Sequence, residues 1–187
     1  MGAEMSPPLS MQTFIFIGYR GTGKTTIAQK LAVRLGIPAF DSDAEIERLA
    51  GKSIADMFTQ EGEPAFRDKE ESVIEAILAR PIPLVLATGG GAILRSRTRE
   101  RLRQSGRVIW LTASPETILR RITNDAASKT MRPNLTALPL QEEIVAVLEQ
   151  RMPLYAETSH ETIDTDVRTV DEIVDALCAT HLLPGQG

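Results

Sequence analysis

Residues 18–25 read Gly-Tyr-Arg-Gly-Thr-Gly-Lys-Thr and carry the spacing G-x-x-x-x-G-K-[ST]. Glycines at this spacing accept positive φ and have no Cβ, so consecutive backbone N–H groups can turn toward an anion. Lys24 can neutralise the β- and γ-phosphates of a nucleotide, and the Thr25 hydroxyl is suited to ligate a magnesium ion bound to them. The pattern therefore predicts a nucleoside triphosphate site.

The elements around this motif are the ones that such a site requires. The apolar run at 14–17 predicts a buried strand before the loop, and Ala28, Leu31, Ala32 and Leu35 recur as one face of a helix after it. A glycine-rich strand-to-helix turn with a solvated lysine would need the same glycines. Only the nucleotide interpretation needs Lys24 followed by Thr25.

Short apolar runs alternate with helical patterns along the rest of the chain. The predicted strands span residues 13–17, 38–40, 84–87, 108–111 and 162–163. This alternation predicts an α/β fold with three αβα layers and a five-stranded parallel sheet. Ligands of such sheets gather at the carboxyl ends of the strands. Polar or glycine-rich segments follow four of the strands there, at 18–25, 41–43, 89–91 and 164–166.

Length and composition limit the classes of protein. With 187 residues and 42% apolar content, we expect one P-loop kinase-like domain over residues 11–187, after a disordered leader at 1–10. A net charge of -4 without a basic run argues against a nucleic acid partner. The single Cys178 and the lack of a run long enough to span a bilayer favour a cytoplasmic monomer with a small-molecule partner and no membrane attachment.

The second substrate must be chosen by residues outside the phosphate-binding loop. Asp41 and Asp43 could serve a metal ion or a hydroxyl group, although Ser42 with Glu45 also fits a helix capping box. Arg67, on a helix that begins near Pro64, could bind an anion or pair with a nearby glutamate. Arg151 could do the same or only close a helix that ends before Pro153. The polar, proline-interrupted stretch at about 124–139 predicts a lid.

Taken in order, these motifs resemble the shikimate kinase family, which has a nucleoside monophosphate kinase-like P-loop fold with a mobile lid. The resemblance covers about residues 13–179. It rests on the phosphate-binding loop and on the segments Asp41-Ser42-Asp43, Ser53-Ile54-Ala55-Asp56, Phe66-Arg67 with Glu70, Gly89-Gly90-Gly91, Arg132-Pro133 and Arg151-x-Pro153-Leu154-Tyr155.

The resemblance implies ATP-dependent phosphorylation of the 3-hydroxyl of shikimate, with Mg²⁺, in the biosynthesis of chorismate and aromatic amino acids. It implies catalytic roles for Lys24, Asp43 and Arg132 and metal ligation by Thr25 and Asp41. The implied shikimate contacts are Asp43, Arg67, Gly89, Gly90, Gly91 and Arg151. The implied nucleotide contacts are Gly21, Thr22, Gly23, Lys24, Thr25, Thr26, Arg121, Arg132 and Arg168.

Two alternatives stay open from the sequence. A kinase of the same fold that acts on another small carboxylated polyol, such as gluconate, would use Asp43, Arg67 and Arg151 in the same way. A non-catalytic nucleotide or shikimate sensor would keep the fold without the chemistry. The full set of phosphoryl-transfer residues, among them Lys24 and Arg132, favours an enzyme over a sensor.

Overall fold

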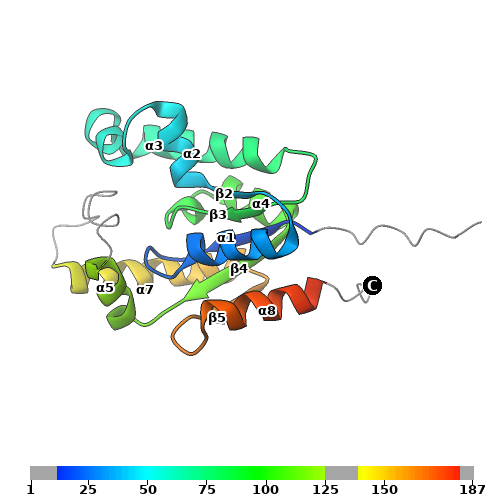
Figure 1. Cartoon of the computed structure of the whole chain (residues 1–187). Coiled ribbons are helices and arrows are strands. Elements are labelled where there is room, and N and C mark those ends of the chain that lie inside the picture. Colours follow the sequence, from blue (N-terminus) through cyan, green and yellow to red (C-terminus); the bar gives the residue numbers. More distant parts are fainter. Residues whose placement is uncertain (1–11, 125–138, 182–187) are drawn as a thin grey trace, which may run out of the picture.

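A five-stranded parallel sheet forms the centre of the protein (Figure 1). The computed structural model describes residues 12–124 and 139–181. The strands are β1 (Phe14–Ile17), β2 (Ala39–Asp41), β3 (Val85–Ala87), β4 (Arg107–Thr112) and β5 (Glu161–Asp164), arranged in the order β2-β3-β1-β4-β5. All four pairings are parallel. The predicted fold class is confirmed.

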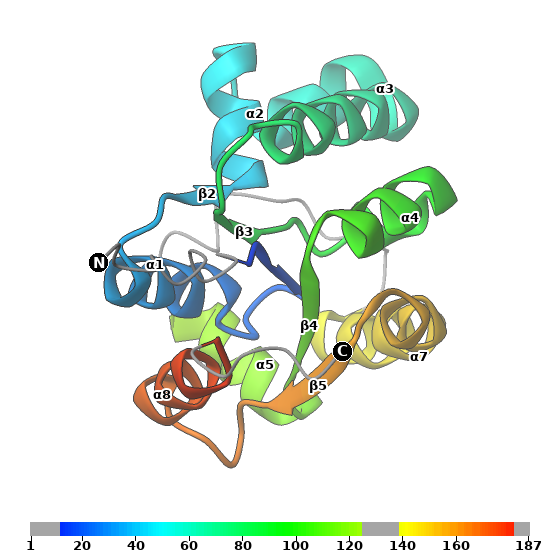
Figure 2. The ribbon, with the colours of Figure 1, turned by 90° about the vertical axis from the view of Figure 1, so that its right-hand side faces the viewer.

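Helices cover both faces of the sheet. They are α1 (Lys24–Leu35), α2 (Ser42–Ala50), α3 (Ile54–Leu78), α4 (Ser96–Ser105), α5 (Pro115–Asn124), α7 (Leu140–Thr158) and α8 (Val170–His181), with a short 3₁₀ turn at Ala92–Leu94. Figure 2 shows α1 and α8 on one face and α4 and α7 on the other. Among the described residues, none of the helices is long and apolar enough to cross a membrane.

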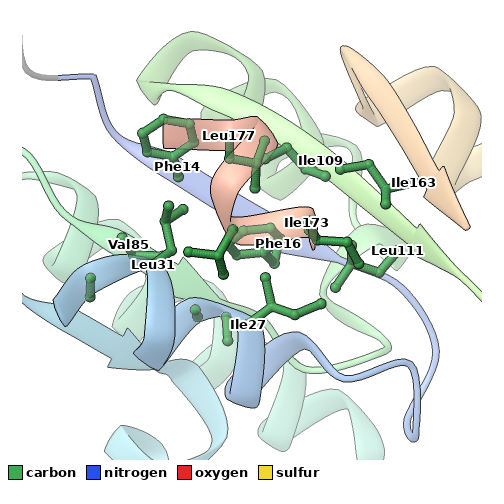
Figure 3. Packing of buried hydrophobic residues seen from close by; sticks show 14 of the residues in the cluster. Phe14, Phe16, Ile27, Leu31, Val85, Ile109, Leu111, Ile163, Ile173 and Leu177 are labelled. Carbon is green, nitrogen blue, oxygen red and sulfur yellow. The ribbon is translucent and has the colours of Figure 1, made fainter. Parts of the chain in front are cut away.

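The alternation of side chains along β1 gives each face of the sheet its own core. Phe14 and Phe16 point toward α1 and α8, where Figure 3 shows them packed with Leu31 and Ile173. Ile15 and Ile17 point to the other face and pack against α3, α4 and α7. All four side chains of β1 are fully buried, so the strand that leads into the phosphate-binding loop is held from both sides.

One helix end differs from the sequence expectation, and another agrees with it. The helix that carries Arg151 was expected to end before Pro153, but α7 continues to Thr158, so that prediction was wrong. Pro153 removes one helical hydrogen bond, yet the following turn is fixed by the fully buried Tyr155, whose packing outweighs that loss. The start near Pro64 is confirmed, because Gly62 at φ +80° breaks α3 just before it.

The capping prediction at the start of α2 was also wrong. Asp41, not Ser42, is the N-cap, and its carboxylate accepts hydrogen bonds from the backbone N–H groups of Asp43 and Ala44. Glu45 instead forms a surface ion pair with Arg48. Asp41 prevails because its backbone is extended at the strand-to-helix junction, as a cap requires. The Ser42 hydroxyl is therefore available to accept a hydrogen bond from the backbone N–H of Gly89.

Two expectations lie outside the described residues. The leader expected at 1–10 falls entirely there, and so does most of the lid expected at about 124–139, including Arg132.

The core on the α1 face should dominate stability. Leu31 is fully buried in the cluster with Phe14 and Phe16, so Leu31→Ala should lower the free energy of unfolding by about 2–5 kcal/mol. Val33 lies on the same helix but is 84% exposed, so Val33→Ala should change it by less than about 0.5 kcal/mol. Urea unfolding followed by circular dichroism measures both, and equal effects would contradict this assignment of the core.

Candidate active site

A cavity of about 550 Å³ lies at the carboxyl ends of β1, β2 and β3. It is lined by Arg20, Gly21, Gly23, Lys24, Thr25, Thr26, Asp41, Asp43, Thr88, Gly90, Arg120, Arg121 and Asn124. Four segments that are distant in sequence therefore meet in one cavity: the phosphate-binding loop, the start of α2, the glycine turn after β3 and the end of α5. The position agrees with the rule for ligands of parallel sheets.

The phosphate-binding loop presents a cation and the N-terminus of α1 to this cavity. Gly23, at φ +89°, precedes the first residue of α1, so the positive end of the helix dipole faces the hollow. The ammonium of Lys24 donates to the carbonyls of Gly18 and Tyr19, each at 2.8 Å. These bonds hold the charge over the loop where phosphate oxygens would lie.

A hydroxyl and a carboxylate stand together beside the loop. The Thr25 hydroxyl donates to Asp41 Oδ2 at 2.6 Å, while Asp41 Oδ1 accepts from Asp43 N at 3.0 Å. The described residues contain no group of three or more His, Cys, Asp or Glu side chains that could hold a metal ion unaided. Mg²⁺ takes one or two protein oxygens together with substrate phosphates and water, so this pair fits a nucleotide-bound magnesium ion.

The glycine turn at 89–91 is fixed by hydrogen bonds with side chains of two helices. The Ser42 hydroxyl accepts from Gly89 N at 2.9 Å. The Gly90 carbonyl accepts from the Tyr155 hydroxyl at 2.6 Å and from Arg151 Nη1 at 3.1 Å. The turn therefore holds its shape through buried polar contacts to α2 and α7.

Arg67 lies directly against the same turn. A Cβ at position 91 would stand 2.4–2.7 Å from atoms of the Arg67 guanidinium, so a larger residue there would have to displace the guanidinium. Arg67 is 5% exposed and donates to Glu70 at 2.5 Å and to Glu63 at 3.0 Å. The pairing with Glu70 that the sequence allowed is thus present. It orients the guanidinium fork in a buried position beside Gly91.

Charge in the cavity suits an anionic ligand. Arg20, Lys24, Arg120 and Arg121 line it, against the carboxylates of Asp41 and Asp43. Arg121 also donates to the carbonyl of Gly21 and to the hydroxyl and carbonyl of Thr165, at 2.9–3.2 Å. Arg121 thereby connects the phosphate-binding loop to Thr165, in the segment that follows β5.

The residues predicted from the sequence divide into three groups. Those that line the cavity are Gly21, Gly23, Lys24, Thr25, Thr26, Asp41, Asp43, Gly90 and Arg121. Those that form the glycine turn or contact it are Gly89, Gly91, Arg67 and Arg151. Two do not reach the cavity with their side chains: Thr22 is buried and donates to the carbonyl of Tyr19, and Arg168 is exposed on the surface. Arg132 lies outside the described residues.

Several site residues escaped the sequence prediction. Arg20, Thr88, Arg120 and Asn124 line the cavity, and Ser42 and Tyr155 fix the glycine turn. Arg20 lies within the loop motif and Arg120 is adjacent to Arg121, so proximity in sequence to predicted site residues could have indicated both. For Ser42 and Tyr155 no local pattern indicates the contact, because each partner lies more than 40 residues away in sequence.

Comparison with known proteins gives consistent results. Residues 20–181 match the family model described as shikimate kinase. The shikimate kinase of Rhodopirellula baltica is 42% identical over 163 residues, which cover 87% of each chain. The shikimate kinase of Syntrophus aciditrophicus is 43% identical over 176 residues, covering 89% of each.

A solved structure agrees with these relatives. The shikimate kinase from Acinetobacter baumannii in complex with shikimate is 35% identical and superposes with a TM-score of 0.85, covering 94% of this chain and 97% of that one. Sequence identities of 35–43% over nearly the whole length show more than a shared fold. The chain belongs to the shikimate kinase family.

Proposed function

We propose that this protein transfers the γ-phosphoryl group of ATP to the 3-hydroxyl of shikimate, giving 3-phosphoshikimate and ADP in the route to chorismate and the aromatic amino acids. The observation that carries the proposal is the meeting of two sites at Gly90. This residue lines the cavity that contains Lys24, and its carbonyl accepts a hydrogen bond from Arg151. A triphosphate site and a carboxylate site therefore adjoin each other.

The acceptor side fits a small hydroxylated acid. Arg67 and Arg151 approach the glycine turn from α3 and α7, and a guanidinium offers paired donors that match a carboxylate. The backbone at 89–91 has no side chain to keep a ring away. Asp43 faces the cavity and can accept from ring hydroxyls, orienting the attacking one and taking its proton.

On the nucleotide side, the loop N–H groups and Lys24 hold the phosphates, and Thr25 with Asp41 hold the metal. Mg²⁺, when bound there, would supply positive charge that offsets the charge of the phosphates. Arg121 forms one wall where the base would lie. From the family resemblance, we also assign to Arg132 the neutralisation of charge on the phosphoryl group during transfer.

One chain carries all of these residues, which supports a monomeric enzyme. We also propose that it acts in the cytoplasm. Its single cysteine, Cys178, allows no disulfide within the chain, and burial raises the pKa of its thiol, which fits a reducing compartment.

The function is tested by ADP release from purified protein with ATP and Mg²⁺, measured with and without shikimate. We expect release that depends on shikimate, with far slower release for gluconate, which is an open chain, or for quinate, whose ring is saturated and carries an additional hydroxyl group. Equal rates with gluconate would identify a different polyol acid as the substrate. Binding of both ligands without release would identify a sensor.

Lys24→Ala should lower kcat by at least about a hundredfold, because it removes the cation aimed at the transferred charge. Lys30→Ala is the matched control, since Lys30 lies on the outer face of the same helix and pairs with Asp171 at the surface. Steady-state assays should show the control within twofold of the wild-type kcat. If the kcat of Lys24→Ala is also within twofold of the wild-type value, Lys24 is not a catalytic residue.

Arg67→Ala should raise the KM for shikimate by about ten- to a hundredfold and leave the KM for ATP nearly unchanged, because a charged hydrogen bond to the carboxylate is lost. Arg97→Ala serves as the control, being an exposed arginine that pairs with Glu71. Because Arg67 and Glu70 form a buried pair, the melting temperature of each variant is recorded as well. An unchanged shikimate KM in a folded Arg67→Ala protein would refute the assignment.

A further inference from the structure

Arg20 is a cation of the phosphate-binding loop with an unusual partner. Its side chain lines the cavity, yet its Nη2 donates to Glu143 Oε1 on α7 at 3.0 Å. The Arg20 side chain is 18% exposed and the Glu143 side chain is fully buried. The ion pair thus joins the loop to a helix 123 residues further along the chain.

Stability alone is a weak reason for such a pair. Removing a carboxylate from water is costly, and buried ion pairs are often no more stabilising than apolar residues of similar volume. Their better-supported contribution is to fix one arrangement of the charged groups. The pair therefore indicates that the position of the Arg20 guanidinium matters.

The backbone of Arg20 lies where the phosphate-binding loop and the glycine turn meet. The backbone N of Arg20 is 3.5 Å from the point that a Cβ of Gly90 would occupy, so the loop and the glycine turn are in contact at this residue. Lys24 fixes the segment just before it through the carbonyls of Gly18 and Tyr19. The Arg20 side chain therefore starts at the junction of the phosphate-binding loop and the glycine turn, and it lines the cavity.

The guanidinium also has donors to offer. Glu143 accepts from one of its five N–H groups and the Tyr19 side chain interacts with the same guanidinium, which leaves further N–H groups for a ligand. The Tyr19 ring, 5.8 Å from the guanidinium carbon, borders it on another side. Burial raises the pKa of Tyr19, so that neighbour stays neutral and does not compete for the charge.

We propose that Arg20 is a second cationic contact of the phosphoryl group in transfer, beside Lys24, and that Glu143 is a positioning residue that holds its guanidinium toward the cavity. The inference rests on the proposed phosphoryl transfer and extends it. Because charge builds on the equatorial phosphoryl oxygens during transfer, the contact should be strongest in the transition state. A purely structural pair would tie the loop to α7 and do nothing more.

Four variants separate these roles: Arg20→Met, Glu143→Gln, the double variant, and Arg34→Met as control. Arg34 is an exposed arginine on α1 that pairs with Asp175 and lies far from the cavity lining. Each is assayed for kcat, for both KM values and for its urea unfolding midpoint. The wild type is assayed first for shikimate-dependent ADP release, so a failure of the proposed function is seen separately.

We expect Arg20→Met to lower kcat by about a hundredfold with little change in either KM, and to lower the unfolding midpoint because Glu143 loses a cationic partner. Glu143→Gln should lower kcat less. In the double variant the midpoint should recover while kcat stays at the Arg20→Met value, because Glu143 acts through Arg20. Arg34→Met should match the wild type.

Two results would overturn the inference. The first is a kcat of Arg20→Met within twofold of the wild type, even with a raised KM for shikimate, since transition-state contact would then be absent. The second is a kcat that recovers together with the unfolding midpoint in the double variant, since the pair would then be structural only.

Discussion

The site depends on the close contact between a glycine turn and two buried arginines. The Gly90 carbonyl accepts from Arg151 and Tyr155, and Gly91 lies so close to the Arg67 guanidinium that a Cβ there would displace it. This contact orients two cations beside a piece of bare backbone. Since charged groups without partners are costly to bury, the turn and its carboxylate neighbours are what allow the arginines to stay inside.

The parallel sheet makes this arrangement possible. Its neighbouring strands β2, β3 and β1 end at one edge, which brings together Asp41, Gly90 and the phosphate-binding loop. The packing on both faces of β1 keeps that edge rigid. Phosphoryl transfer relies on positioning and electrostatics, so a rigid edge with converging cations is the part that the protein must supply.

Most of the fold followed from patterns within short segments. The strands were found to within two residues because apolar runs and polar strand ends are local signals, and Lys24, Thr25, Asp41 and Asp43 were found because they adjoin those ends. The errors had non-local causes. α7 continues past Pro153 because the Tyr155 hydroxyl is bound to the carbonyl of Gly90. Ser42 does not cap α2, because its hydroxyl accepts a hydrogen bond from the backbone N–H of Gly89. The pairing of Arg20 with Glu143 spans most of the chain and leaves no trace in either segment.

The central claim is that nucleotide and shikimate lie side by side in the cavity at Gly90. Proton relaxation of shikimate, measured with the protein and ADP while Mn²⁺ replaces Mg²⁺, tests this directly, since a paramagnetic ion accelerates relaxation only at short range. The account predicts strong acceleration that disappears when Mg²⁺ is restored. Shikimate that binds the protein but relaxes no faster with Mn²⁺ than with Mg²⁺ would contradict it.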